Sequence, residues 1–515
     1  MGEVIEDRIK YIKENKYLII LILILFGSFL LRLDLFSINV NQSYWWDEST
    51  YLNTAKYWAF GEPDWNAEAL RPPLFIALLA LLFKIGLSET SIRFLLLLIP
   101  SLLLVFIVYL LGKELFNKEA GLIAAVVTGV AWNLLFNTSR VHTDIPYTLA
   151  IISTVYFFYK GYVKEENIKR NLIITGALFS IAYSIRETAL TFVPAFLIYI
   201  LLKEKRNILK QKKLLYIIIP AILFAIPYFT YGMINFNHPA PWLESRLRAV
   251  TEESADDPIT SACFMMLQTN LEWVWFVFMI LGLILTLRFI IIIDKVIKNI
   301  KDEEYKGEIF LAIFFLSTIL FFTFANKTCA EPRWIMPIVI LGALLIGYAL
   351  NWIYNYFKPM NKYLALIFIL IVLVIGAYTN IQHNNQVIQA KLPSFNQFVD
   401  TGKIIKETTN KDAIIATVTT QAEVQYSSNR KTLGWPGNNE KEVLEYFKEI
   451  KPEYIIVSFY VNPSPQEQWK LIYPYQHPNI FPIVKIYPPL VENKIPFVGL
   501  FKINYEELDK RLKEL

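Results

Sequence analysis

Two adjacent carboxylates offer the most direct chemistry in this sequence. Asp47 and Glu48 follow a pair of tryptophans shortly after the first long apolar run. Placing an ionisable side chain at the edge of a membrane costs desolvation energy, so such residues usually have a function. A desolvated carboxylate can act as a base near neutral pH. The alternative is a solvated helix start, because Asp and Glu also favour the first turn of a helix. The segment 49–58 would continue that helix along the membrane interface and carries Tyr51 as a further candidate.

Two arginines beside proline or aromatic residues are candidates for binding a phosphate group. Arg71 precedes a Pro-Pro pair, and Arg333 lies between a proline and Trp334. A guanidinium forms strong paired hydrogen bonds with phosphate oxygens. The alternatives are an arginine that reaches from an apolar segment to water and a tryptophan that marks the membrane interface.

Further ionisable residues lie in two short connections between apolar runs. Arg140, His142 and Asp144 occupy one connection, where Asp144 offers a second acid or caps the helix that follows. Arg186 and Glu187 occupy the other, where we favour an ion pair between these two neighbours.

The composition places these residues in a polytopic α-helical membrane protein. Of 515 residues, 55% are hydrophobic, which excludes an ordinary soluble protein. A further apolar run at 72–87 is interpreted as a surface helix. We expect eleven spans, several only just long enough to cross, at 17–36, 91–111, 120–137, 145–162, 171–185, 188–202, 214–233, 271–293, 308–325, 333–356 and 361–380.

Charge sets the predicted orientation. With 72–87 on the surface, the Lys- and Arg-rich loops and the N-terminus fall on one side, which is then the cytoplasm. The acidic loop 234–270, the first outer loop at about 37–90 and the C-terminal part fall outside. The net charge of +5 is spread over cytoplasmic loops, which argues against a nucleic-acid partner. The first apolar run is long and lacks a small-residue cleavage site, so we expect a retained anchor.

The chain divides by composition into a membrane domain at 1–380 and an extracytoplasmic soluble α/β domain at 381–515. Strands are predicted at 413–418 and 454–459 with a helix at 440–450 between them, further strands at 481–487 and 497–503, and ordered loop over much of 460–489. The two cysteines, Cys263 and Cys329, both map to outer loops, and the pattern leaves open a disulfide or two buried thiols.

The order of these motifs resembles the GT-C membrane glycosyltransferases, specifically the protein O-mannosyltransferase and aminoarabinose transferase superfamily. The likeness covers roughly the first 380 residues and rests on WWDEST, RPPL, the pattern R-x-H-x-D-x-P, EPRW and the soluble C-terminal domain. It implies a GT-C membrane fold of about eleven transmembrane helices with juxtamembrane helices on the outer face.

The resemblance also implies roles for individual residues. Asp47 corresponds to the catalytic carboxylate, with Glu48 beside it, and Asp144 to the acid of the second outer loop. Some bacterial members carry an arginine where this chain has Thr50. The resemblance implies Arg71, Arg333 and Trp334 as ligands of the donor phosphate. The part of the phosphate site that the arginine provides in those members is then missing here, or it is supplied by Arg140 or Arg333.

The activity expected from these observations is an inverting transfer of a hexosyl or pentosyl group. The donor would be a dolichyl or undecaprenyl phosphate sugar, and the acceptor a protein, a glycan or a lipid on the outer face of the cell membrane. No cofactor is expected, while a divalent cation held by Asp47, Glu48 and Asp144 is left open. The alternatives are a metal-dependent oligosaccharyltransferase, a transporter or flippase of a lipid-linked substrate, and a structural or receptor protein.

Overall fold

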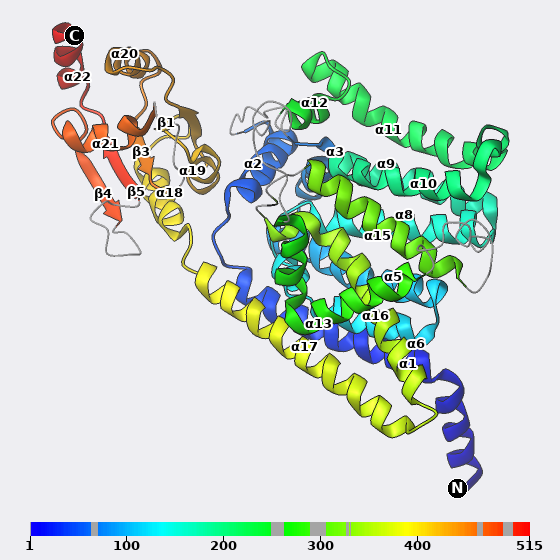
Figure 1. The fold of residues 1–515 in the computed structure, drawn as a ribbon. Helices are drawn as coiled ribbons and strands as arrows, with labels where there is room; N and C mark the ends of the chain where they lie inside the picture. Colours follow the sequence, from blue (N-terminus) through cyan, green and yellow to red (C-terminus); the bar gives the residue numbers. More distant parts are fainter. Residues whose placement is uncertain are drawn as a thin grey trace. The chain divides into compact units, whose positions relative to one another are not determined.

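The computed structural model describes residues 2–62, 71–248, 262–288, 305–325, 329, 331–460, 467–487 and 498–515 (Figure 1). The chain forms two compact units. The first contains residues 1–40, 68–75 and 89–388, and the second contains 41–67, 76–88 and 389–515. The boundary predicted at residue 380 therefore falls inside a continuous helix, α17, which ends at Lys391.

The first unit is helical in its described residues. Helices α8 and α9 pack along each other, as do α9 and α11, α5 and α6, and α13 and α16. The helices are α1 (Gly2–Asn39), α4 (Glu89–Arg93), α5 (Ile99–Leu115), α6 (Lys118–Val130), α7 (Trp132–Asn137), α8 (Asp144–Phe158), α9 (Ile168–Ile185), α10 (Val193–Glu204), α11 (Leu215–Phe236), α12 (Pro241–Arg248), α13 (Ala262–Leu287), α15 (Lys306–Ala325), α16 (Met336–Phe357) and α17 (Lys362–Lys391).

Seven helical stretches of the described chain are long and apolar enough to cross a membrane: 14–39, 89–115, 212–236, 262–287, 306–324, 332–357 and 362–408. This is fewer than the eleven predicted spans. The other four predicted spans coincide with the shorter or interrupted helices α6 with α7, α8, α9 and α10. The run at 72–87 forms α3 (Pro73–Lys84), whose 12 residues are too few to cross a bilayer.

Small residues allow the helices of the first unit to approach closely. A Cβ atom at Gly121 in α6 would lie 2.6 Å from the carbonyl oxygen of Tyr109 in α5. Glycine is therefore required at this crossing, as is typical of helix pairs in membranes.

The second unit contains the small α/β domain. Its five-stranded sheet has the order β2-β1-β3-β5-β4, in which β1 runs parallel to β2 and β3, and β5 runs antiparallel to β3 and β4. The strands are β1 (Ile414–Thr417), β2 (Lys431–Gly434), β3 (Tyr454–Ser458), β4 (Ile483–Tyr487) and β5 (Val498–Lys502). The helices are α2 (Trp46–Phe60), α18 (Asn396–Thr408), α19 (Gln421–Ser428), α20 (Glu440–Ile450), α21 (Gln468–Gln476) and α22 (Tyr505–Glu514).

Buried apolar side chains from both faces stabilise this sheet. Phe447 of α20 and Leu508 of α22 pack with Ile455 and Phe501 of the central strands. Phe398 and Ile405 of α18 pack with other residues of the same strands. The predicted α/β domain is confirmed, and the segment expected to be ordered loop contains helix α21.

Candidate functional site

The adjacent acids Asp47 and Glu48 have different surroundings at the start of α2. The side chain of Glu48 is buried, and its Oε2 accepts a hydrogen bond from the backbone N–H of Trp45 at 3.0 Å. This contact satisfies one of the open donors at the helix N-terminus. Asp47 is only partly buried. Glu48 therefore stabilises the start of the helix, and Asp47 is the acid that also reaches solvent.

Helix α2 is held by the C-terminal part of the second unit. Asn53 donates a side-chain hydrogen bond to the carbonyl oxygen of Ala422 at 2.9 Å, and the Lys56 ammonium lies 4.3 Å from the ring centre of Tyr426. Tyr51 is buried in the same helix. The segment that carries Asp47 is thus packed against helix α19.

His142 lies at the centre of a cluster of positive charge in the first unit. Its side chain is buried, and burial lowers its pKa well below the usual range. The charges of four guanidinium groups lower this pKa further, and they belong to Arg333, Arg140, Arg186 and Arg71. The four arginines come from connections that are far apart in the sequence. The structure thus brings together five of the predicted site residues in what we call the arginine cluster.

Two of these guanidinium groups have a carboxylate partner: Arg186 pairs with Asp144, and Nε of Arg333 lies 3.9 Å from Oε2 of Glu331. The four guanidinium groups outnumber these two carboxylates and the imidazole is neutral, so the cluster still attracts an anion. Guanidinium groups pair with phosphate oxygens through two hydrogen bonds at once. The arrangement is therefore suited to binding a phosphate group.

Asp144 pairs with Arg186 in this cluster. The Oδ1 atom of Asp144 accepts a hydrogen bond from Nη1 of Arg186, and the acid is almost completely buried. The residue before it, Thr143, stands at the N-cap of α8 without a side-chain capping bond. Arg186 thus forms an ion pair with Asp144, a partner that the sequence did not indicate, and Asp144 is the first residue of α8.

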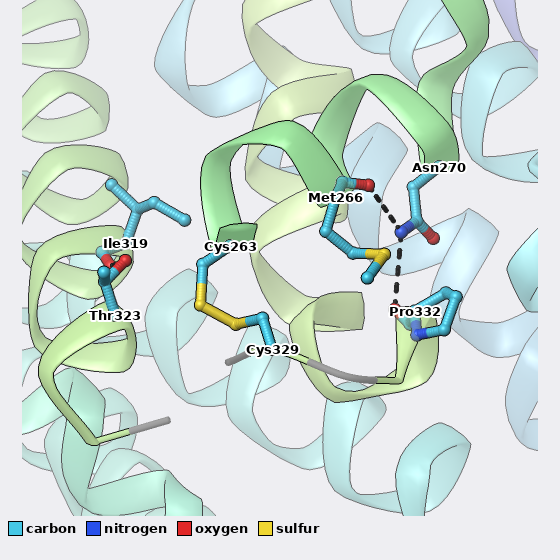
Figure 2. The surroundings of a disulfide bond; sticks show 7 residues. All are labelled: Cys263, Met266, Asn270, Ile319, Thr323, Cys329 and Pro332. Atoms are coloured by element: carbon cyan, nitrogen blue, oxygen red, sulfur yellow. Dashed lines mark hydrogen bonds between the residues drawn. A yellow bond between two sulfur atoms is a disulfide. The ribbon is translucent and has the colours of Figure 1, made fainter. Parts of the chain in front are cut away.

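Two asparagines hold the turn that carries Arg333. Asn133 of α7 donates a side-chain hydrogen bond to the carbonyl oxygen of Pro332 at 2.8 Å and another to Oδ1 of Asn270 at 2.7 Å. Asn270 of α13 also contacts this carbonyl oxygen at 3.4 Å (Figure 2). Because Pro332 directly precedes Arg333, these amides position the arginine.

A third asparagine, Asn137, connects Asn133 to His142. Asn137 donates to Oδ1 of Asn133 at 2.7 Å, and its own Oδ1 lies 3.3 Å from Nδ1 of His142. An amide oxygen only accepts, so Nδ1 of the imidazole carries the proton in this arrangement. None of these three asparagines was predicted from the sequence, although amide side chains at the ends of apolar helices require buried partners.

A disulfide anchors the same turn. Cys263 at the beginning of α13 is bonded to Cys329, three residues before Pro332 (Figure 2). The question left open by the sequence is thereby settled in favour of a bond. The turn of Arg333 is consequently fixed to α13 by one covalent bond and by the side chain of Asn270.

A mostly apolar cavity of about 600 Å³ lies among helices α8 to α12 of the first unit. Aromatic and aliphatic side chains line it, among them Phe158, Phe179, Tyr183, Phe196, Ile218 and Phe229. Two of its helices have an end beside the arginine cluster, because Asp144, the partner of Arg186, begins α8 and Arg186 itself follows the end of α9. The apolar cavity is thus lined by helices whose ends adjoin the phosphate-type site.

The described part of the chain contains no group of three or more His, Cys, Asp or Glu side chains placed to hold a metal ion. The expectations about cofactors and cations stay predictions.

Comparisons with known proteins agree with this architecture. Residues 70–231 match the family model for dolichyl-phosphate-mannose-protein mannosyltransferase. No curated protein sequence matches the chain significantly.

Solved structures match over almost the whole chain. ArnT from Cupriavidus metallidurans bound to undecaprenyl phosphate is 11% identical, with a TM-score of 0.61 over 94% of this chain and 98% of that one. The Archaeoglobus fulgidus oligosaccharyltransferase AglB, in complex with an inhibitory peptide and a dolichol-phosphate, is 12% identical, with a TM-score of 0.59 over 91% and 71%. The resemblance stated from the sequence is confirmed: the chain has the GT-C fold of membrane glycosyltransferases.

Proposed function

We propose that the chain is an integral-membrane glycosyltransferase that moves one sugar from a polyprenyl phosphate carrier to an acceptor. The observation that carries the proposal is the arginine cluster around His142, which adjoins the ends of two helices that line the apolar cavity. A polyprenyl phosphate has an anionic group joined to a long hydrocarbon chain. It matches this combination of a basic site and an apolar cavity better than a soluble nucleotide sugar does.

The matched structures support this choice of donor. One contains undecaprenyl phosphate and another a dolichol-phosphate, and the matching family model describes a dolichyl-phosphate-mannose enzyme. In this proposal Arg71 and Arg333 bind the phosphate and Trp334 lies beside it.

The phosphate is the leaving group of the proposed reaction. A hydroxyl oxygen of the acceptor attacks the anomeric carbon, the bond from that carbon to the phosphate oxygen breaks, and the electron pair leaves with the phosphate. Guanidinium groups in surroundings of low dielectric constant stabilise the charge that develops there. The polyprenyl phosphate then leaves as an anion and requires no proton.

Asp47 is the proposed general base. It accepts the proton of the attacking hydroxyl while the bond to the phosphate breaks, and attack from the opposite side inverts the anomeric carbon. Glu48 stabilises the helix, and Asp144 sets the orientation of Arg186. We infer that the reaction takes place on the outer face of the membrane, with the N-terminus in the cytoplasm.

The test is sugar release from a panel of polyprenyl phosphate sugars by purified protein, with and without a chelator. We expect Asp47→Asn to reduce turnover by roughly 10²–10⁴-fold, because that is the usual contribution of general base catalysis. Glu62→Gln is the matched control, since it removes an exposed carboxylate from the same connection, and it should stay within about twofold of wild type.

The other outcomes decide between functions. Turnover that a chelator abolishes would favour a metal-dependent oligosaccharyltransferase. The fold match to the Archaeoglobus fulgidus enzyme is the reason to test this candidate. Full turnover by Asp47→Asn would reject Asp47 as the base. Absence of turnover with every donor would reject the transferase and leave transport of a lipid-linked substrate.

A further inference from the structure

Glu423 of helix α19 is a buried acid that the proposed reaction does not use. Only 3% of the residue is exposed, and neither carboxylate oxygen makes a hydrogen bond to another residue in the described part of the chain. An ionised carboxylate in such a place would lack the partners that buried charges require. The side chain is therefore either the neutral acid or requires a further hydrogen-bonding or cationic partner to be ionised.

Glu423 lies where the second unit packs against α2. The residue before it, Ala422, accepts the hydrogen bond from Asn53 at 2.9 Å. Three residues after it, the ring of Tyr426 contacts the ring of Tyr44 at 4.8 Å between centres, in an edge-on arrangement. These contacts flank Glu423 on both sides and involve residues just before and within the helix that begins with Asp47.

Electrostatics links the two acids. Burial raises the pKa of Glu423 to about 8; the backbone N–H of the same residue opposes this rise, and the negative charge of Asp47 adds to it. Among the described groups, Asp47 is the one whose charge acts on this carboxyl. Other charged residues of the elements packed on α19 are Glu48 and Lys56 of α2, Asp400, Lys403, Lys406 and Glu407 of α18, and Lys431 of β2.

We propose that Glu423 is a positioning residue for Asp47, kept as a neutral carboxylic acid so that α19 can pack on α2 without a second negative charge beside the base. The inference rests on the proposed function for the role of Asp47. It gives the C-terminal segment a part in the reaction, because that segment supplies the face against which the base is held.

The proposal predicts that transferase activity falls at alkaline pH. Below pH 8 the acid is neutral, and above pH 8 its ionisation places a second anion in the packed interface between α19 and α2. If only the neutral form supports turnover, kcat/KM falls by about tenfold for each pH unit above this value. Conformational stability falls in a lower range, between about pH 4.5 and about pH 8, because there the unfolded chain has released this proton while the folded chain retains it.

The test compares wild type with Glu423→Gln, which has nearly the same shape and is always neutral. We expect the variant to stay within about twofold of wild type at pH 7 and to lose the alkaline decline. Glu407→Gln is the control, because it removes an exposed carboxylate from the neighbouring helix α18 and should retain that decline. If Glu423→Gln does not fold, Glu423→Met provides a second neutral side chain.

Two results would overturn the proposal. One is an alkaline decline that is absent from wild type or unchanged in the neutral variants. The other is a folded Glu423→Gln protein without turnover at pH 7, because the ionised carboxylate would then be the required form.

A second measurement separates this inference from the proposed function. Thermal unfolding of the full chain against pH requires no donor. In wild type, stability should fall as pH rises from about 4.5 to about 8, and this component should disappear in Glu423→Gln. In Asp47→Asn the upper end of this range should move to lower pH. If wild type, Glu423→Gln and Asp47→Asn show identical dependences of unfolding on pH, the link between the two acids is rejected even if turnover is observed. If the unfolding profiles are as predicted but no turnover is found, only the enzymatic role is rejected.

Discussion

Asp144 and Arg186 form the most clearly structural pair among the residues that chemistry alone would select. The carboxylate is almost completely buried and its partner is mostly so. Asp144→Asn should therefore destabilise the protein by about 3–5 kcal/mol, as is usual when one member of a buried ion pair is removed. The measurement is thermal unfolding in detergent. Combining Asp144→Asn with Arg186→Met should recover part of the loss, and a single variant as stable as wild type would contradict a structural role.

Arg71 should act on the donor and not on the stability of the fold. Its side chain is half-buried, and its positive charge reaches His142. We expect Arg71→Gln to raise the KM for a polyprenyl phosphate sugar by roughly ten- to a hundredfold, the value of one hydrogen bond to a charged group. Arg248→Gln, which removes an exposed guanidinium from α12, is the control and should leave KM unchanged. Equal increases of KM in both variants would show that the total positive charge of the protein, and not the position of Arg71, determines donor binding.

At the scale of elements, the turn from Cys329 to Ile335 determines where Arg333 lies. The disulfide closes a loop across a sequence separation of 66 residues, and such a loop stabilises a fold by about 4 kcal/mol in the chain-entropy description. Reduction should therefore lower the melting temperature and raise the KM for the donor while kcat changes little. A variant with both Cys263→Ser and Cys329→Ser should behave like the reduced wild type and should not respond to reductant. A KM unaffected by reduction would show that Asn133 and Asn270 alone suffice to hold the turn.

Local patterns explain why some elements could be predicted from the sequence. Strands β1 and β3 are short apolar runs beside turn residues, and α20 has an apolar face repeated with helical spacing. The α/β domain was therefore predictable. Hydropathy does not register breaks inside an apolar run, such as the one at Ala131 between α6 and α7.

Partners far apart in the sequence could not be predicted. Asp144 and Arg186 each have a nearer candidate partner, and only the packing of α8 on α9 joins them. Asn133 and Asn270 both donate to the carbonyl oxygen of Pro332, which is far from them in the sequence. The sequence nevertheless identified the four arginines that act on His142, because Arg71 and Arg333 stand beside proline or aromatic residues and Arg140 and Arg186 lie in short connections between apolar runs.

At the scale of the whole molecule, the chain enters the second unit three times, at 41–67, 76–88 and 389–515. The α/β domain is thus not an independent appendage. It includes the connection that carries Asp47, and the hydrogen bond from Asn53 to Ala422 lies inside it. Sequence-based division of the chain at one position could not recover this arrangement, because it assumes that domains are continuous.

The orientation that the loop charges predict for the molecule in its membrane can be tested with single cysteines. Wild type is the natural control, since both of its cysteines are in a disulfide and should not react with a maleimide. Glu407→Cys places an exposed thiol on α18, and Lys212→Cys places one in the basic connection before α11. Because basic connections remain in the cytoplasm, a membrane-impermeant maleimide added to intact cells should label Glu407→Cys and not Lys212→Cys. Permeabilisation should expose both thiols, and labelling in the reverse order would place Asp47 and the second unit in the cytoplasm, where a reaction on the outer face could not occur.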